Sequence, residues 1–258
     1  RDYRGGGRSS ARETIGRVAA GAIAEKFLKQ LNISVTAYAK SIGPVEVSPE
    51  RMDLSEIPNN RFCLPDADSA KEAEHYLDQK IAECDSVGGV VECVISGLPT
   101  GLGEPVFEKL DANLAKAILS IGAVKGFEIG DGFAATKACG SENNDEFRMD
   151  GDKIVKETNH AGGVLGGISD GSDVIFRAAF KPTPSIAKSQ ETVTKDGENI
   201  DLVIHGRHDP VVVPRAVVVV ESMAAITAMD MLLMSMTSRL DLIQMFFQVE
   251  NVDDSPEQ

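Results

Sequence analysis

Residues 5–10, with the sequence Gly-Gly-Gly-Arg-Ser-Ser, have the composition of a phosphate-binding segment. Glycines let the backbone approach an anion closely, and the free N–H groups and dipole of a following helix favour negative charge. Arg8 and Arg12 would add forked hydrogen-bond donors. The segment matches neither G-x-x-x-x-G-K-[ST] nor G-x-G-x-x-G, so it does not support a nucleoside triphosphatase or a dinucleotide-binding protein. A flexible start to a helix is the other interpretation.

Two prolines stiffen the run Lys181-Pro182-Thr183-Pro184-Ser185. Proline rings fix the backbone, which leaves the lysine, threonine and serine as polar groups that could grip a phosphate or a ribityl chain. An ordinary proline-rich loop is the alternative, and the run alone does not decide between the two.

Ionisable residues crowd the turn His205-Gly206-Arg207-His208-Asp209-Pro210, which follows an apolar segment. A carboxylate beside arginine and histidine suits proton transfer, or the fixing of an arginine on an anion. Two histidines three residues apart could ligate a metal, but no third ligand is evident and a strand end does not align them, so we predict no metal site. A surface turn closed by Asp209-Pro210 is the alternative.

Four glycines surround the pair Val164-Leu165 within residues 159–169. A backbone without side chains suits close contact with a flat ligand or with another chain that crosses it. His160 in this run could titrate near neutrality, but a hydrogen-bonded structural role is the more common one for a single histidine.

The charge and cysteine content limit the partners of this chain. A formal net charge of −14 over 258 residues argues against a nucleic-acid partner, because phosphate neutralisation needs a basic face. Residues 1–17 reverse this balance, since they contain five arginines against one aspartate and one glutamate. The 4 cysteines include no C-x-x-C pair, which favours a reducing compartment. Charged residues interrupt the longest apolar region, at 211–236, so no membrane span is predicted.

Hydrophobic periodicity predicts that alternating helices and strands position these motifs. We predict helices at residues 11–31, 69–84, 106–121 and 215–247, and strands at 33–40, 88–96, 124–129, 174–180 and 200–204. In the first helix, Ser10 and Glu13 match a capping box, and apolar residues from Ile15 to Leu31 recur at helical spacing. A methionine-rich stripe from Met223 to Met236 indicates core or a subunit interface rather than a cofactor box.

This pattern predicts an α+β protein with layered helices and antiparallel or mixed sheets. We predict a single domain over residues 1–248, with an exposed loop at residues 141–158. An acidic tail at residues 249–258 would follow the domain.

Five segments, taken in order across essentially the whole chain, resemble the motifs of the chorismate synthase family. They are Arg-Asp-Tyr-Arg-Gly-Gly-Gly-Arg-Ser-Ser-Ala-Arg-Glu-Thr at residues 1–14, Gly-Ala-Val-Lys-Gly at 122–126 with Gly-Asp-Gly-Phe at 130–133, Asn-His-Ala-Gly-Gly at 159–163, Lys-Pro-Thr-Pro-Ser at 181–185 and Gly-Arg-His-Asp-Pro at 206–210. The resemblance implies a β-α-β sandwich enzyme, usually a homotetramer, and a carbon–oxygen lyase acting on phosphates. Such an enzyme converts 5-enolpyruvylshikimate 3-phosphate to chorismate and phosphate by 1,4-elimination with reduced FMN, in the shikimate pathway to the aromatic amino acids.

The resemblance also implies roles for individual residues. FMN would contact Arg8, Ser9, Ser10, Gly122, Ala123, Gly166, Lys181, Pro182, Thr183, Pro184, Ser185 and Arg207. Arg12 and Arg207 would hold substrate anions, and Asp209 matches the family's catalytic aspartate, which assists proton transfer at the flavin. The family usually has Asn or Gln where Gly122 stands. Residues 162–167 would lie near the flavin ring.

Family members carry a further N-terminal third with two catalytic histidines and with arginines for the substrate and for reduced pyridine nucleotide (NADPH). On this basis the chain alone is expected to show little turnover, because general acid groups each contribute about 10²–10⁴-fold. His160 and His208 would not take over these roles. A flavin- or phosphate-binding module without catalytic activity is the alternative function. The expected compartment is the cytoplasm, or the plastid if the source is a plant or an alga.

Overall fold

A five-stranded antiparallel sheet forms the centre of the protein, which we describe from a computed structural model for residues 6–204, 206 and 209–248, without the side chains of Arg8 and Lys153. The strand order is β2-β1-β3-β9-β4. The strands are β1 (Ser34–Ile42), β2 (Val45–Glu46), β3 (Gly89–Ser96), β4 (Val124–Ile129) and β9 (Val174–Phe180). The predicted strands at residues 33–40, 88–96, 124–129 and 174–180 are therefore confirmed.

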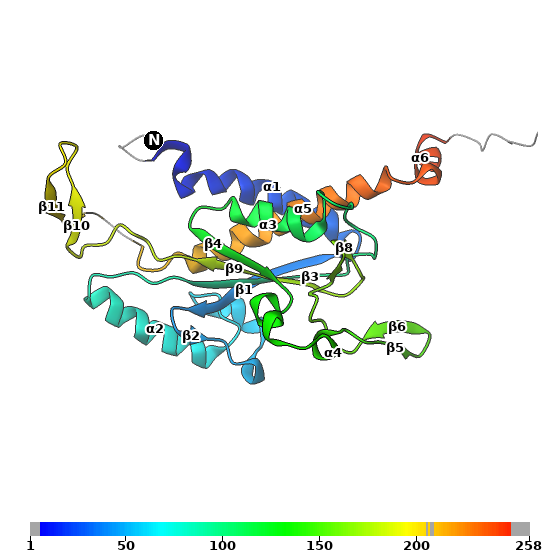
Figure 1. Ribbon diagram of the computed structural model, residues 1–258, viewed down its shortest axis with the longest axis horizontal. Coiled ribbons are helices and arrows are strands. Elements are labelled where there is room, and N and C mark those ends of the chain that lie inside the picture. The colour runs from blue at the N-terminus through cyan, green and yellow to red at the C-terminus, as the bar shows by residue number, and fades with distance from the viewer. Residues whose placement is uncertain (1–5, 205, 207–208, 249–258) are drawn as a thin grey trace, which may run out of the picture.

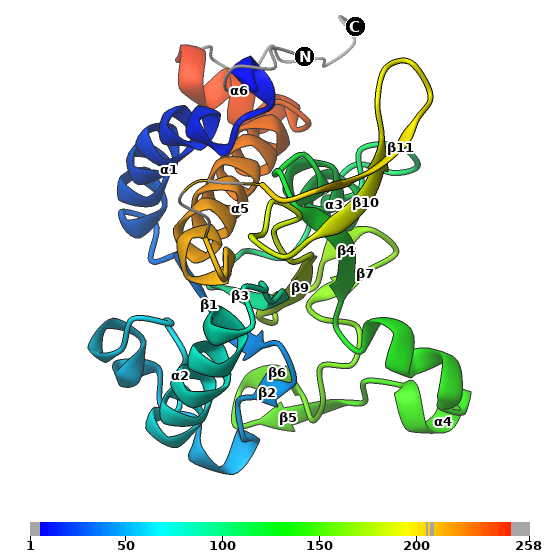
Figure 2. The same cartoon turned by 90° about the vertical axis from the view of Figure 1, so that its left-hand side faces the viewer.

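Helices lie on both faces of this sheet (Figure 1). Three of them, α1 (Thr14–Lys29), α3 (Leu110–Leu119) and α5 (Val213–Met236), cover one face, and α2 (Ala67–Ala82) lies on the other. Figure 2 shows α1 and α5 side by side. The short helices are α4 (Gly140–Asn143) and α6 (Leu240–Phe247), and 3-10 turns occur at Gly7–Ser9, Ala11–Glu13, Pro49–Arg51, Leu54–Asn59 and Gly132–Lys137. The layered α+β architecture predicted from the sequence is confirmed.

Three small hairpins extend from this core. They are β5–β6 (Phe147–Asp150 and Lys153–Lys156), β7–β8 (Val164–Leu165 and Ile168–Ser169) and β10–β11 (Gln190–Val193 and Asn199–Leu202). The first hairpin lies in the segment predicted to be an exposed loop. Most of that segment is exposed, but Asp145 and the side chain of Lys156 are buried. Periodicity missed β10 because its polar residues alternate with few apolar ones.

The bounds of the predicted helices differ from those of the observed ones. A 3-10 turn precedes α1, so the α-helix begins at Thr14. Helix α3 begins at Leu110 rather than at Val106, whose φ of 72° lies in the left-handed region. The observed helix α5 begins two residues before the predicted start at residue 215. The predicted helix at residues 215–247 divides into α5 and α6, and Arg239 between them has an extended backbone.

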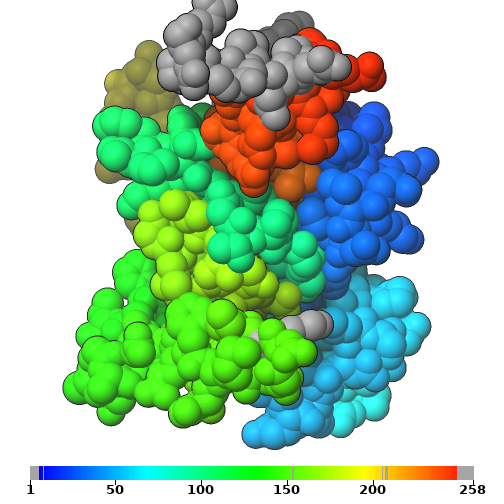
Figure 3. Space-filling view, turned by 90° about the vertical axis from the view of Figure 1, so that its right-hand side faces the viewer, coloured from blue at the N-terminus to red at the C-terminus, as the bar shows by residue number. Residues whose placement is uncertain are grey.

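The apolar stripe of α1 faces largely outward. Ile15 and Ile23 are 78% and 70% exposed, whereas Gly21, Ala24 and Leu28 are buried against the core. Gly21 allows this arrangement, since a Cβ at this position would lie 2.2 Å from the Cβ of Ser222 on α5. Small residues therefore set the buried face of α1. The space-filling view shows α1, in blue, at the surface beside the orange and red C-terminal helices (Figure 3).

Helix α5 has the length and composition of a membrane-spanning helix, with a mean hydropathy of 1.9 in its most apolar window. Half of that window is buried inside the protein. Its buried face consists mainly of Val and Ala residues, with Ser222, Thr227 and Met231, and it packs on β1, β3, α1 and α3. The methionine stripe lies at the margin of this face, because Met223 and Met229 are half-buried and Met236 is exposed. The position of α5 fits a helix that packs in a hydrophobic core.

A row of polar side chains crosses four strands of the sheet. The strand register aligns Tyr38 with Glu92, Glu92 with Arg177, and Arg177 with Glu128. The Tyr38 hydroxyl donates a hydrogen bond to Glu92, and Arg177 Nε lies 3.0 Å from Glu128 Oε1. Burial, followed by the hydrogen bond with Glu92, raises the pKa of Tyr38 well above its usual range.

A side chain of α5 reaches the outer edge of β1. Strand β2 pairs with β1 only at Ser41 and Ile42, so the preceding part of this edge carries no partner strand among the described residues. The Ala37 N–H donates to Glu221 Oε2 at 2.8 Å, and the Ala39 N–H donates to the Cys63 carbonyl at 2.9 Å. Burial raises the pKa of Glu221.

Candidate functional site

One cavity, of about 290 Å³, brings several of the predicted site residues together. It lies where the N-terminal segment, the end of α3 and the beginning of α5 meet. Its polar lining comes from Arg12, Thr14, Asp209 and Arg215, and its remaining lining residues are Ala11, Ile121, Gly122, Phe180, Val212, Ala216 and Val219. The antiparallel register explains this meeting, since Val124 at the start of β4 pairs with Phe180 at the end of β9.

The backbone at Gly122 lines the cavity, and Ala123 follows it in a left-handed conformation. A Cβ at Gly122 would meet no atom within 4 Å. Ala123 has a φ of 75°, and its carbonyl accepts a hydrogen bond of 3.0 Å from the N–H of Lys181. There is therefore room at position 122 for the Asn or Gln that the family usually has.

The side chain of Arg12 projects from the N-terminal turn, and no hydrogen bond or ion pair to its guanidinium occurs among the described residues. The backbone of Arg12 is engaged within the turn, because its N–H donates to Ser10 Oγ at 3.4 Å and its carbonyl accepts from the Thr14 N–H. The predicted capping box is wrong in its second half. Glu13 pairs with Arg17 at 2.9 Å, and the Ser10 N–H donates to the Gly7 carbonyl instead.

The hydroxyls of Ser9 and Ser10, which were predicted to contact FMN, already form hydrogen bonds within this turn. Ser9 Oγ donates to the Gly6 carbonyl, while Ser10 Oγ accepts from the Arg12 N–H. Ser10 Oγ therefore keeps its own proton for a ligand, whereas Ser9 would have to rotate. The side chain of Arg8 lies outside the described part of the chain.

Asp209 stands at the opposite wall, and its carboxylate forms an ion pair with Arg215 in the first turn of α5. The backbone beside it is fixed, because the Pro210 carbonyl accepts a hydrogen bond of 2.8 Å from the Val87 N–H. Arg207, predicted to hold FMN and substrate anions, lies outside the described residues, as do His205 and His208.

A second cavity, of about 310 Å³, adjoins Asp209 from the other side. Its lining includes Cys84, Asp85 and Ser86 from the end of α2, together with Ile81, Ile186, Ala187, Asp209 and Pro210. Ser86 Oγ donates to the Thr183 carbonyl at 2.7 Å. The predicted run of residues 181–185 thus leaves the end of β9 and passes beside this second cavity.

The structure does not bring Gly166 to these cavities. Gly166 lies in the turn between β7 and β8, where the neighbouring Gly167 carbonyl accepts from the N–H of Leu110 at the start of α3. Gly122 follows the end of the same helix, so the ten residues of α3, which span about 15 Å, separate the two.

Most of the other glycines in this run are explained by close contacts within the chain. A Cβ at Gly162 would lie 2.3 Å from the Gly130 nitrogen, and a Cβ at Gly163 would lie 2.5 Å from the Asp173 carbonyl oxygen. His160 Nδ1 lies 2.6 Å from Asp131 Oδ2, which confirms its predicted hydrogen-bonded role.

Asp145 fixes the backbone of this loop. It accepts hydrogen bonds from the N–H groups of His160 and Ala161, from Thr158 and from Lys156. Burial raises the pKa of Asp145, but these hydrogen bonds outweigh burial and hold the pKa well below its usual range.

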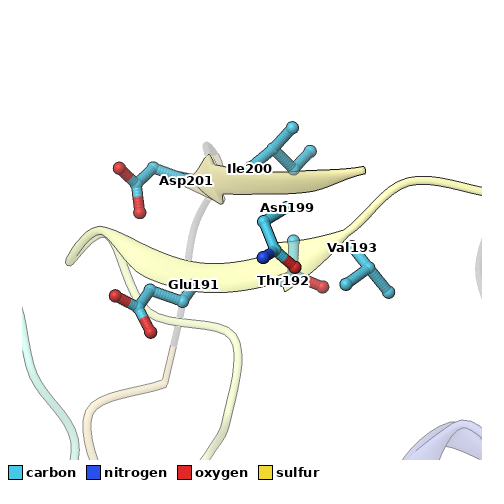
Figure 4. A pocket seen from close by; sticks show the side chains of 6 residues that line it. All are labelled: Glu191, Thr192, Val193, Asn199, Ile200 and Asp201. Carbon is cyan, nitrogen blue, oxygen red and sulfur yellow. The ribbon is translucent and has the colours of Figure 1, made fainter. Parts of the chain in front are cut away.

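The largest hollow among those described, of about 500 Å³, lies on the β10–β11 hairpin (Figure 4). Its lining includes the carboxylates of Glu191 and Asp201 and contains no cation. Such a surface is unsuited to an anionic ligand. Within residues 6–204, 206 and 209–248, no cluster of three histidine, cysteine, aspartate or glutamate side chains could hold a metal.

Sequence reasoning missed Arg215, Cys84, Asp85 and Ser86. Arg215 had a weak signal, because it stands six residues after Asp209 at the beginning of an apolar helical pattern. No sequence signal marked Cys84, Asp85 and Ser86, because only the folded chain brings the segment after α2 to Asp209.

Comparisons with known proteins point to one family. A family model described as chorismate synthase matches residues 1–233. Chorismate synthase of Lachnoclostridium phytofermentans is 61% identical over 249 residues, which cover 96% of this chain and 68% of that protein. That of Agathobacter rectalis is 63% identical over 248 residues, with the same two coverages. A crystal structure of chorismate synthase superimposes with a TM-score of 0.75 at 30% identity, over 93% of this chain and 69% of the other.

Proposed function

The chain belongs to the chorismate synthase family of lyases, and from this we propose that it forms the site where 5-enolpyruvylshikimate 3-phosphate loses phosphate to give chorismate, with reduced FMN as cofactor. The observation that carries the proposal is the cavity shared by Arg12, Gly122 and Asp209. A substrate with one phosphate and two carboxylates needs cationic, forked donors, and the Arg12 guanidinium has no partner among the residues that the structure describes. A binding module without catalytic activity is not favoured by these matches.

The lining suits part of a flavin nucleotide rather than the whole molecule. Ligand pockets usually measure about 300–1,000 Å³, and each of the two cavities that meet at Asp209 is near the lower limit. FMN would be held by the open backbone of Gly122 with the neighbouring Ala123, by the free hydroxyl proton of Ser10 and by residues 181–185, together with Arg8 and Arg207. Contact with Gly166 remains a prediction from the resemblance.

Reduced FMN, when bound, supplies an electron transiently to the substrate. Arg12 would bind the substrate's anionic group and stabilise the charge of the departing phosphate. Asp209 would accept and return a proton at the reacting end of the cavity. The apolar side chains of Ile121, Phe180 and Val219 would limit water there, which strengthens the attraction between the guanidinium and the anion.

The test is the substitution Asp209→Asn in a chimaera that joins this chain to the rest of the Lachnoclostridium protein. Asn keeps the shape of the side chain but cannot exchange a proton. We expect phosphate release from the substrate, with dithionite-reduced FMN, to fall by about 10²–10⁴-fold. The affinity for FMN, measured by quenching of flavin fluorescence, should not fall.

Asp241→Asn provides the matched control, because Asp241 pairs with Arg239 on the surface at the start of α6. It should alter neither rate nor affinity. If Asp209→Asn weakened FMN binding while turnover per bound flavin stayed normal, the catalytic role of Asp209 would be refuted.

The homotetramer, the use of NADPH and the cytoplasmic location remain proposals that rest on family membership. Apolar side chains exposed on the hairpin β10–β11, such as Val193 and Ile200, support the proposal of subunit contacts.

A further inference from the structure

Arg215 is a second guanidinium in the cavity of Arg12. It projects from the first turn of α5, and its side chain is 68% exposed. Its present partner, Asp209, lies six residues earlier, and the Asp209 side chain is 38% exposed. Ion pairs that solvent can reach contribute little to stability, so an anion with better geometry could displace this carboxylate.

The cavity holds more positive than negative charge. Arg12 and Arg215 face a single carboxylate, that of Asp209, while Ile121, Phe180 and Val219 make up much of the remaining wall. Arg12 has no ion-pair partner within the described part of the chain. The chain as a whole has a net charge of −14 and would repel anions. The guanidiniums of Arg12 and Arg215 make this cavity locally positive, which favours the binding of an anion.

We propose that Arg12 and Arg215 together bind a phosphate or carboxylate group, and that Asp209 occupies Arg215 only until this anion arrives. The inference rests on the proposed function, because it assigns the cavity to anionic ligands. Arrival of the anion would transfer the Arg215 fork from Asp209 to the ligand. Asp209 would then be free for proton transfer only when the site is filled. Arg215 is thus an anion-binding residue that also positions Asp209.

Titration calorimetry of this chain with inorganic phosphate tests the exchange. Arg215→Gln should weaken phosphate binding by about tenfold, and Arg215→Lys should restore part of the loss because it keeps the charge without the fork. Asp209→Asn should strengthen phosphate binding by about threefold or more, since it removes the competing carboxylate. This gain should vanish in the double variant Arg215→Gln/Asp209→Asn.

The Arg239–Asp241 pair supplies the control, because its side chains are 66% and 58% exposed and it also lies at the start of a helix. Asp241→Asn should leave phosphate affinity unchanged. The proposal is overturned if Asp209→Asn leaves phosphate binding unchanged or weakens it, or if neither the chain nor this variant binds phosphate.

Competition distinguishes the two sources of the anion. If FMN, but not riboflavin, prevents phosphate binding, the site takes the flavin phosphate. If shikimate 3-phosphate prevents it, the site takes the substrate phosphate. The proposed function has its own measurement in substrate turnover and FMN affinity, so either hypothesis can fail without the other.

Discussion

Asp66 illustrates how one buried carboxylate joins two elements. It is 2% exposed, accepts hydrogen bonds from the N–H groups of Asp68 and Ser69 at the start of α2, and lies 2.9 Å from Arg51. Burial raises the pKa of Asp66, but the hydrogen bonds from Arg51, Ser69 and the backbone outweigh burial and lower the pKa well below its usual range. The folded state therefore favours the ionised form.

This depressed pKa predicts a loss of stability in acid. A group whose pKa is lower in the folded state stabilises the fold above its unfolded pKa, about 3.9 for Asp, and loses that contribution as the pH falls further. We expect Asp66→Asn to lower the free energy of unfolding by about 1.5–3 kcal/mol at pH 7, with the difference shrinking below about pH 4. Urea unfolding at several pH values measures this.

Asp68→Asn is the comparison, since the Asp68 side chain is 66% exposed in its pair with Lys71. This substitution should lower the free energy of unfolding by less than about 0.5 kcal/mol at any pH. An effect of Asp66→Asn that did not vary with pH would show that the charge has no part in it.

Arg12, Gly122 and Asp209, which line one cavity, could be predicted from the sequence as site residues because each belongs to a short motif that resembles a family pattern. Arg215 could not, because its contact with Asp209 depends on how α5 begins after the loop. Nor could the separation of Gly166 from the cavity be predicted. A local glycine pattern does not say which end of α3 the turn will approach.

At the scale of elements, the strands were easier to predict than the faces of the helices. Strict alternation specified β1, and flanking glycines bounded β3. In α1, however, Ile15 and Ile23 suggested one face, while the buried face contains Gly21 and Ala24. Hydrophobicity undervalues small residues, which bury themselves by close approach between helix backbones rather than by their own area.

Two glycines of α1 give opposite predictions. At Gly16 a Cβ would meet nothing within 4 Å, whereas at Gly21 it would overlap Ser222. Gly16→Ala should stabilise the chain by about 0.5–1 kcal/mol through helix propensity. Gly21→Ala should destabilise it by about 2 kcal/mol or more, because α1 and α5 would have to separate.

Thermal or urea unfolding of the two variants makes this comparison within a single helix. If both substitutions stabilised the chain, the close approach of α1 to α5 would be wrong.

At the scale of the whole molecule, the polar row across the sheet connects strands that are distant in sequence. Arg177 is its single guanidinium, placed between Glu92 and Glu128 in the register. Removing a partner from a buried ion pair leaves uncompensated charge, which costs about 3–5 kcal/mol when burial is complete. The Arg177 side chain is 27% exposed, so its removal should lower the free energy of unfolding by about 3 kcal/mol or less.

We therefore predict that Arg177→Met lowers the free energy of unfolding by about 2–3 kcal/mol. Replacing Glu92 and Glu128 with Gln in the same chain should recover much of this loss, as measured by urea unfolding. Arg239→Met, which removes a surface guanidinium, is the control and should cost less than about 0.5 kcal/mol. Failure of the Gln substitutions to restore stability would show that Arg177 acts by packing alone.

The edge of β1 affects how copies of this chain behave in a crowded solution. An unpaired strand edge offers N–H and carbonyl groups to another chain, which is a common start of aggregation. The Glu221 carboxylate and the Cys63 carbonyl already accept the hydrogen bonds of the Ala37 and Ala39 N–H groups, and a half-buried carboxylate cannot pair with an incoming strand. Helix α5, which packs on one face of the sheet and carries Glu221, thus also protects the edge of β1 against edge-to-edge association.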